Sequence, residues 1–549
     1  MIRLIHNTNP FIKTPNIMKK HNMLTVGALA AAMLFSACNK EMNAPADSTG
    51  GGQDVVEGIP TYAKVEITQR ASSGTYAGDA GDYVHGNSPA SEEERRINSA
   101  YVLIFDKMGV LERTQQLTAD GEGKVFSATF PITTGVKKCF AVANVPLKDN
   151  KDQDTEFGKI LTEFAKGTPY KLDAVRSAIL QIASIKEATD TDERKGFYMG
   201  NVYKLGAMDE ETHTIEKATE DEVTAEDGPK NNITIYIGRM VSKVTPKFTA
   251  TAATQIGGAL TDLKYRVRNN PKRFYLFPVY VKDGEEDKKV DVLSSPYFGI
   301  SQYDWTQPQD QYPTKLTLGS FFSNNHSADG QAEDETRFAT FDDASYLTEN
   351  SPKTPLRRKA TMLSIRGKWT PNNDQILDAA GVATNAKLTD VDGTFCRVQI
   401  IGAAEDANKG LILGYLPGVY DVTDPNSITV AWKETIGDEE NKIEMENGAG
   451  KEQGTLDGAA VTYKAVVYTG GICYYGYWMK QNINGASVAQ QYAIKRNNHY
   501  NVSISSVDGP GDPTEDDVLN KPDEIEADSY MKAIIEVLNW NVVDIEGGI

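Results

Sequence analysis

The chain has 549 residues, of which 40% are hydrophobic and 24% are charged, as in a soluble protein of about two or three folded domains. Its net charge of -19 argues against nucleic acid as a partner, because phosphates are neutralised by lysine and arginine. The same acidity argues against docking on anionic lipid through a basic patch. Acidity of this size instead favours solubility at a crowded surface.

Residues 1–38 have the organisation of an export signal. A basic stretch that begins at Met18 precedes the apolar run 24–35, which is too short to span a bilayer. The run ends in a Ser-Ala-Cys sequence at Cys38, which resembles a bacterial lipobox, in which the cysteine is lipidated and becomes the first residue after cleavage. An ordinary cleavage site with a chance cysteine is the alternative, and translation can start at position 1 or at Met18. Residues 39–58 are polar and predict a tether.

The first predicted strand spans residues 62–69, where apolar and polar side chains alternate as in a half-buried strand. Arg70 follows it directly, and Ala71 opens a small, glycine-rich, polar segment. An arginine between a strand and an exposed segment suits a trypsin-like protease, although a plain edge-strand arginine would give the same pattern. The apolar positions of this strand are Ala63, Val65 and Ile67.

We expect residues 59–250 to form one β-rich domain with a short helical insertion. The helices are predicted from apolar residues spaced i, i+3, i+4, i+7. They are Phe157, Ile160, Leu161 and Phe164 in a first helix, and Leu172, Val175, Ile179 and Ile182 in a second. The predicted strands after the first are 100–105, 125–131, 138–144, 196–200, 233–237 and 241–248.

Residues 251–507 predict a second strand-rich domain, with long polar loops between its strands. Many strands separated by turn residues favour sandwiches over a βαβ sheet. The predicted strands are 263–267, 275–281, 360–369, 395–401, 465–468, 473–479 and 500–505. Three cysteines lie in apolar runs and suit small buried hydrophobes, with their pairing left open. They are Cys139, Cys396 and Cys473.

The C-terminal end changes character twice. Residues 508–528 are acidic, lack an apolar period and predict an extended linker, whereas residues 529–549 are strongly apolar. Ala533, Ile535 and Val537 repeat the ridge of the first strand, so both segments fit the same groove of a sheet in compatible register. Chance similarity over five residues is the alternative. The ridge continues with further apolar residues, which are Leu538, Trp540 and Val542.

The sequence offers no catalytic, cofactor or metal site. The six histidines are scattered, and HExxH, GxSxG and P-loop motifs do not occur. Asp390 to Gly393 has some character of a calcium loop but lacks the remaining spaced ligands, so a tight turn explains it better. A secreted hydrolase would need a convergent site that the sequence does not offer. We therefore expect a protein that is not an enzyme.

The chain resembles the fimbrial shaft proteins of Bacteroidia-type (type V) pili, because motifs of that family occur in the same order over nearly its whole length. Within the family, it resembles most the major subunit of the short, or minor, fimbriae. The resemblance rests on the lipobox at Cys38, Arg70 at the end of the first strand and the apolar tail. The further motifs lie at 97–106, 140–144, 364–371, 474–478, 496–502 and 539–542.

This resemblance implies two transthyretin-like β-sandwich domains and export as a palmitoylated lipoprotein to the outer membrane, then incorporation into a cell-surface fimbrium. It implies cleavage after Arg70 by an arginine-specific protease, with Ala71 as the mature N-terminus and strand 62–69 removed. The groove then takes the C-terminal donor strand, residues 533–545, of the next identical subunit, and the head-to-tail fibre supports adhesion. Anchor and tip accessory pilins are further implied partners. The long loops of the second domain match least.

One alternative is a monomeric surface lipoprotein that binds glycans through its sandwich loops. Aromatic pairs such as Phe274-Tyr275 or Tyr474-Tyr475 would supply the binding surface. A monomer of this kind would fold residues 533–545 into its own sheet, so the place of the tail discriminates between the two functions.

Overall fold

The computed structural model describes residues 55–69, 87–119, 125–149, 151–182, 188–190, 196–201, 212–251, 254–255, 257–283, 290–294, 322–323, 338–352, 355, 357, 359–372, 376–377, 383–384, 393–403, 412–417, 435–436, 443–444, 454–456, 459–483, 486–519 and 531–541. Over these residues the protein is mainly β with few helices, which confirms the mainly β class expected from the sequence. None of the helices in these segments has the length and hydropathy needed to cross a membrane.

Eight strands build the largest sheet. They are β1 (Pro60–Gln69), β3 (Ala100–Asp106), β4 (Leu111–Ala119), β5 (Phe126–Thr133), β6 (Gly135–Ala143), β10 (Met199–Asn201), β11 (Thr212–Ile215) and β12 (Asn232–Arg239). Their order is β10-β12-β1-β5-β4-β3-β6-β11, and β10 also pairs with β6, so the sheet closes on itself. β3 and β6 are apolar almost throughout and buried on both faces, whereas β1 alternates.

The helical insertion lies where the sequence predicts it. Helix α2 (Glu156–Ala165) begins after Thr155, whose hydroxyl accepts a hydrogen bond from the Gly158 N–H at 3.0 Å. Helix α3 (Leu172–Arg176) is shorter than expected, because Ile179 belongs to a strand. The shorter elements around this region are β2 (Asn87–Pro89), α1 (Glu92–Arg95), β7 (Ile179–Gln181), β8 (Thr189–Asp190), β9 (Gly196–Phe197), α5 (Glu220–Thr224) and β16 (Arg273–Tyr275).

The early end of α3 has a local cause. The Ser177 hydroxyl donates to the Asp173 carbonyl oxygen at 2.8 Å and so competes for a helical acceptor. The chain then extends into β7, which pairs antiparallel with β16. Phe274 of β16 is fully buried in the same core as the eight-stranded sheet. The helical spacing therefore mispredicted Ile179 and Ile182. Ile179 is partly buried in β7, and Ile182, just after this strand, is buried.

Two further sheets share the second core. They contain β13 (Val241–Phe248), β14 (Gly258–Arg268), β20 (Ala339–Thr340), β21 (Ser345–Thr348), β22 (Met362–Pro371), β31 (Ile472–Trp478), β32 (Asn498–Val507) and β33 (Met531–Asn541). One sheet has the order β2-β33-β32-β13-β21 and the other β20-β14-β22-β31. Trp369 and Tyr265 are among the largest fully buried side chains between them.

A six-stranded sheet has the order β24-β23-β26-β25-β30-β29. Its strands are β23 (Ile376–Leu377), β24 (Ala383–Thr384), β25 (Phe395–Ala403), β26 (Ile412–Pro417), β29 (Gly454–Leu456) and β30 (Ala459–Tyr468). The remaining described elements are β15 (Asn270–Pro271), β17 (Val279–Asp283), β18 (Val290–Ser294), β19 (Phe322–Ser323), β27 (Thr435–Ile436), β28 (Ile443–Glu444), η8 (Thr469–Gly471), α7 (Val488–Gln491) and α8 (Glu515–Leu519).

Strand β13 departs from the expected division of the chain. We placed residues 241–248 in the first domain, but β13 pairs in parallel with β32 and antiparallel with β21. Strand β12 ends at Arg239, and the Met240 N–H that follows donates to the Tyr198 carbonyl oxygen at 2.8 Å. The chain therefore passes from the first sheet to the second at Met240, ten positions before the expected boundary at residue 250.

Residues 508–519, the first part of the segment expected to be a linker (508–528), pack against the folded protein. Glu515 at the start of α8 is 1% exposed, and its carboxylate pairs with Arg266 and, at 2.6 Å, with Arg268. A Cβ added at Gly511 would lie 2.0 Å from the Tyr474 carbonyl oxygen, so only glycine allows this close approach. The Glu515 carboxylate therefore belongs to a buried ion cluster. The expectation of an extended linker is wrong for residues 508–519.

Two cysteines have the environment expected of small hydrophobes. Cys139 and Cys473 are fully buried. Burial raises the pKa of the Cys473 thiol to about 11. The side chain of Cys396 lies outside the described residues.

Candidate functional site

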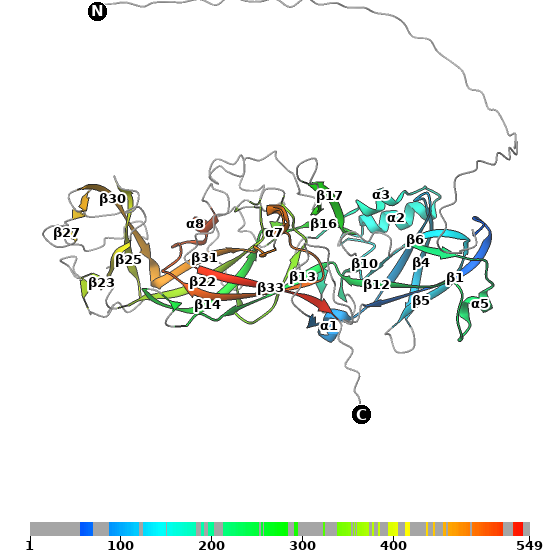
Figure 1. Ribbon diagram of the computed structural model, residues 1–549, viewed down its shortest axis with the longest axis horizontal. Coiled ribbons are helices and arrows are strands. Elements are labelled where there is room, and N and C mark those ends of the chain that lie inside the picture. Colours follow the sequence, from blue (N-terminus) through cyan, green and yellow to red (C-terminus); the bar gives the residue numbers. More distant parts are fainter. Residues whose placement is uncertain are drawn as a thin grey trace, which may run out of the picture. The chain divides into compact units, whose positions relative to one another are not determined.

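The strand predicted to be removed, β1, occupies the interior of the eight-stranded sheet (Figure 1). It pairs antiparallel with β5 from Pro60 to Ile67 and in parallel with β12 from Lys64 to Gln69. Both of its edges are therefore hydrogen bonded. The side chains that alternate toward the core, Ala63, Val65 and Ile67, are each 0% exposed.

The residues around this ridge define the groove that β1 fills. Across from the ridge, the register pairs Ala63 with Phe130 and Ile67 with Phe126 on β5. On β12, Val65 lies opposite Ile233 and Ile67 opposite Ile235. All four partners are buried. The sequence alone left these groove-lining residues open.

Removal of β1 would uncover this apolar groove and two rows of backbone groups. Burial of a valine or isoleucine side chain contributes roughly 1.5–3 kcal/mol, and the ladder hydrogen bonds on both edges would also be lost. An emptied groove of this kind fits an extended peptide that restores both the apolar ridge and the main-chain bonds.

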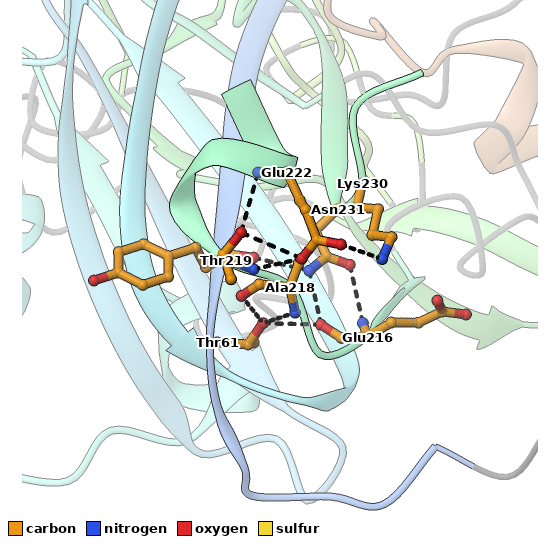
Figure 2. Close-up of polar contacts among 8 residues, drawn as sticks. Thr61, Glu216, Ala218, Thr219, Glu222, Lys230 and Asn231 are labelled. Atoms are coloured by element: carbon orange, nitrogen blue, oxygen red, sulfur yellow. Dashed lines mark hydrogen bonds and ion pairs between the residues drawn. The ribbon is translucent and has the colours of Figure 1, made fainter. Parts of the chain in front are cut away.

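A polar clasp, which we define as residues 216–231, holds the beginning of β1 (Figure 2). The Thr61 hydroxyl accepts a hydrogen bond from the Ala218 N–H at 2.7 Å. The same hydroxyl donates to two carbonyl oxygens. Its oxygen lies 2.9 Å from that of Glu216 and 3.1 Å from that of Ala218. Thr61 is 3% exposed, so these contacts are shielded from water.

Asn231 connects the clasp to the backbone of β1. Its side-chain amide donates to the carbonyl oxygens of Tyr62 and Glu216, each at 2.8 Å, and its Oδ1 accepts from the Glu216 N–H at 2.9 Å. Its own carbonyl oxygen accepts from the Lys64 N–H at 3.1 Å. Asn231 has a left-handed φ of 49°, a conformation that asparagine tolerates better than most residues.

Helix α5 stiffens the clasp. Thr219 and Glu222 form a reciprocal capping box at its start, and the Lys230 ammonium donates to the Glu222 carboxylate at 2.6 Å (Figure 2). The contact with Lys230 lowers the pKa of Glu222 to about 2. The carboxylate is therefore charged at physiological pH.

The chain just before β1 is also fixed. Thr134 makes two backbone hydrogen bonds to it, donating to the Ile59 carbonyl oxygen at 2.8 Å and accepting from the Gly58 N–H at 3.1 Å. The Lys107 ammonium lies 2.7 Å from the Glu57 carboxylate. The N-terminal end of β1 is thus held by polar contacts in addition to the burial of its apolar side chains.

At the opposite end, the Gln69 side chain donates to the Arg95 carbonyl oxygen at the end of α1. Glu94 in this helix pairs with the Lys243 ammonium at 2.9 Å and accepts from the Tyr346 hydroxyl at 2.9 Å. The predicted cleavage position, Arg70 with Ala71, follows immediately but lies outside the described residues, as does Cys38.

The C-terminal strand β33 lies in a different sheet from β1. It pairs antiparallel with β32, with Ile535 opposite Val502, and its far end pairs with β2. Ala533 and Ile535 are only partly buried there, whereas their counterparts in β1 are fully buried. Leu538 is partly buried. The side chains of Val537 and Trp540, and all of Val542, lie outside the described residues.

The structure does not bring the two matching strands of one chain together. It places β33 in the chain's own sheet, as the monomeric alternative expects. Three of the four aromatic residues named for that alternative, Phe274, Tyr474 and Tyr475, are at most 3% exposed and offer no binding surface. Tyr275 is partly exposed.

Sequence reasoning missed Thr61 and the clasp. The signal for Thr61 was present, because the alternation of β1 continues one step before Ala63 and places Thr61 on the buried face. Ala218 and Glu216 contribute mainly through backbone atoms, which carry no sequence signal. Asn231 precedes an apolar strand, a position where asparagine is common in turns.

Two sequence families match the chain. Residues 63–258 match the family described as major fimbrial subunit protein (FimA). Residues 466–546 match the family described as major fimbrial subunit protein type IV, fimbrillin, C-terminal. The first match begins at Ala63 within β1, and the second includes all of β33. No curated protein matches the chain at a significant level.

Solved structures of fimbrial proteins are also similar. A fimbrilin (fimA) from Porphyromonas gingivalis W83 is 13% identical, with 88% of this chain and 98% of that chain covered and a TM-score of 0.40. The tip fimbrial protein Mfa3 from Porphyromonas gingivalis, with a C-terminal truncation, is 11% identical, with 87% and 100% covered and a TM-score of 0.33. The family assignment rests on the two sequence matches. The chain belongs to the fimbrillin family of Bacteroidia-type (type V) fimbrial subunits.

Proposed function

We propose that this fimbrial subunit builds the shaft of a short, or minor, surface fimbria by donor-strand exchange. In this proposal the chain is exported as a lipoprotein through Cys38 and cleaved after Arg70. Strand β1 then leaves, and the C-terminal strand of the next subunit enters the groove. The observation that carries the proposal is the full burial of Ala63, Val65 and Ile67 in a strand paired on both edges.

The match between the two strands supports the exchange. Ala533, Ile535 and Val537 repeat the spacing and the small-to-branched order of the β1 ridge. In its own sheet this strand leaves Ala533 and Ile535 partly exposed, whereas the groove buries the corresponding positions completely. The transfer therefore gains apolar burial, and the groove supplies hydrogen bonds on both edges.

The place of β33 in its own sheet is compatible with this cycle. A subunit whose own β1 fills the groove has no vacant groove to offer, so an apolar C-terminal strand is best covered on the same chain. The uncleaved β1 is held at high effective concentration by its covalent link and blocks premature assembly. Cleavage and departure of β1 convert the subunit to an acceptor.

Exchange between copies is head-to-tail. Each subunit offers a strand at one site and a groove at another, and such a heterologous contact builds an open filament. The proposed partners are identical subunits, an arginine-specific protease, and anchor and tip accessory pilins. The precursor would reside in the outer membrane through its lipid before it joins the fimbrium, which supports adhesion.

The test uses purified full-length precursor treated with an arginine-specific protease. We expect a ladder of oligomers that survives SDS without heating, and none from an Arg70→Ala precursor. Deletion of residues 529–549 should leave cleavage intact and abolish the ladder. A ladder that persists after this deletion would overturn the assignment of the donor strand.

A further inference from the structure

Resting on the proposed function, we infer that the clasp (residues 216–231) discriminates the resident strand β1 from an incoming donor strand, with Thr61 as the specificity-determining residue. The partner recognised by the clasp is an extended strand with a hydroxyl side chain two positions before its first small apolar residue. Thr61 occupies this position in β1, one step before Ala63 on the same face.

The pocket at Thr61 is built for a hydroxyl group. It presents one donor, the Ala218 N–H at 2.7 Å, and two acceptors, the carbonyl oxygens of Glu216 and Ala218 (Figure 2). A hydroxyl accepts and donates at once and so satisfies both kinds of group. The burial of Thr61 means that water does not replace these contacts when the side chain is changed.

The donor strand lacks this group. When its ridge is superposed on that of β1, so that Ala533 takes the place of Ala63, Met531 takes the place of Thr61. A thioether donates no hydrogen bond and accepts only weakly. An incoming strand in this register therefore leaves the Ala218 N–H without its acceptor, which a buried donor tolerates poorly.

The other contacts of the clasp do not discriminate. Asn231 binds the backbone carbonyl of Tyr62 and the backbone N–H of Lys64, which the donor strand reproduces with Lys532 and Ile534. Any strand without proline at these positions would make the same bonds. The side chain at the Thr61 position is thus the feature of the clasp by which the two strands differ.

The position of the clasp on β1 sets the order in which the strand would leave the groove. Cleavage after Arg70 frees β1 at the Gln69 end, whereas the clasp grips the opposite end of the strand. The resident strand should therefore remain bound after cleavage and leave from the Gln69 end first, with Thr61 released last. Cleavage alone would not open the groove.

The first experiment measures how long the N-terminal fragment ending at Arg70 stays bound after cleavage of the full-length chain. Thr61→Val removes the hydroxyl at nearly constant volume, and Thr61→Ser restores it. Thr68→Val is the matched control, because the Thr68 hydroxyl donates to the adjacent Gln69 carbonyl oxygen at 3.3 Å, away from the clasp. We expect the Thr61→Val fragment to dissociate about tenfold faster than wild type, with Thr61→Ser and Thr68→Val close to wild type.

Equal dissociation rates for Thr61→Val and Thr68→Val would overturn the inference. Thermal unfolding of each uncleaved variant shows whether the substitution disturbs the fold. If Thr61→Val folds poorly, Thr61→Ser still decides the question. Faster release of the Thr61→Ser fragment would contradict a role for the hydroxyl.

The second experiment changes the incoming strand. Met531→Thr should accelerate growth of the SDS-resistant ladder, whereas Lys532→Thr, which introduces the same side chain on the other face, should not. Equal ladder growth in both variants would contradict the inference while leaving donor-strand exchange intact. If no variant forms a ladder, the proposed function fails, and the fragment dissociation rates still decide the role of the clasp.

Discussion

The Ser88 hydroxyl and Nδ1 of His499 form a hydrogen bond of 2.7 Å, and Nε2 of the same imidazole bonds the Thr245 hydroxyl at 2.9 Å. Ser88 lies in β2, the segment that follows the predicted cleavage position and pairs with the end of β33. His499 lies in β32, which pairs with β33 along its length. The imidazole thus connects β2 with β32, the two strands that pair with β33.

This imidazole should make stability depend on pH. Burial, and then the nearby Lys243 ammonium, lower the pKa of His499 to about 4, with Lys247 acting in the same direction and Glu94 in the opposite one. The unfolded chain binds a proton near the ordinary value of about 6.5. Between these pH values the unfolded state binds more protons, so the free energy of unfolding falls as the pH drops.

Urea unfolding at pH 7 and pH 5 measures this effect. We expect wild type to lose more stability between these conditions than His499→Gln, whose amide keeps a donor and an acceptor but does not titrate. An equal loss in both proteins would show that other groups carry the acid sensitivity.

The buried carboxylate of Glu515 should be essential for stability. Glu515→Gln removes the carboxylate charge that pairs with Arg266 and Arg268 at a site that is almost fully buried. Loss of one member of a buried ion cluster costs about 3–5 kcal/mol, so urea unfolding should shift markedly. Asp517→Asn, on the exposed side of the same helix, is the control and should change little. A mild effect of Glu515→Gln would mean that α8 contributes little to the fold.

Ile67→Ala and Ile535→Ala, which shorten equivalent side chains of the two strands, should rank in opposite order of destabilisation in the subunit and in the fibre. In the uncleaved subunit, Ile67→Ala should cost about 2–5 kcal/mol because Ile67 is fully buried, and Ile535→Ala should cost less because Ile535 is only partly buried. In the proposed fibre β1 is absent and Ile535 fills the groove. There Ile535→Ala should lower the temperature at which the ladder dissociates, whereas Ile67→Ala should not. The same ranking in both states would contradict the exchange.

The sequence predicted those elements whose pattern is local. Strand β1 was found because its apolar residues alternate without interruption, and α2 because its apolar side chains repeat at the helical period. Strand β4 was missed because LERTQQLTA is mainly polar, with Leu111 and Leu117 as its buried hydrophobic residues. Its identity as a strand comes from pairing with β3, which the apolar pattern of β4 alone does not reveal.

Features that depend on distant partners were beyond the sequence. The acidic segment around Glu515 looked like a linker because the arginines that neutralise it lie far away in the chain. The clasp was invisible for a related reason, since the Thr61 side chain bonds backbone atoms of residues 216 and 218. The lining of the groove required the register of β1 against β5 and β12.

The most direct test of donor-strand exchange is a disulfide between two subunits. Lys64 lies opposite Thr129 on β5, and Ile534 would take the place of Lys64 in the proposed exchange. Cross-strand neighbours are close enough for a disulfide, so we mix Thr129→Cys subunits with Ile534→Cys subunits under oxidising conditions. We expect crosslinked pairs after treatment with the arginine-specific protease and none in the untreated mixture. Ladders without this crosslink, or crosslinks that form equally without cleavage, would contradict the account.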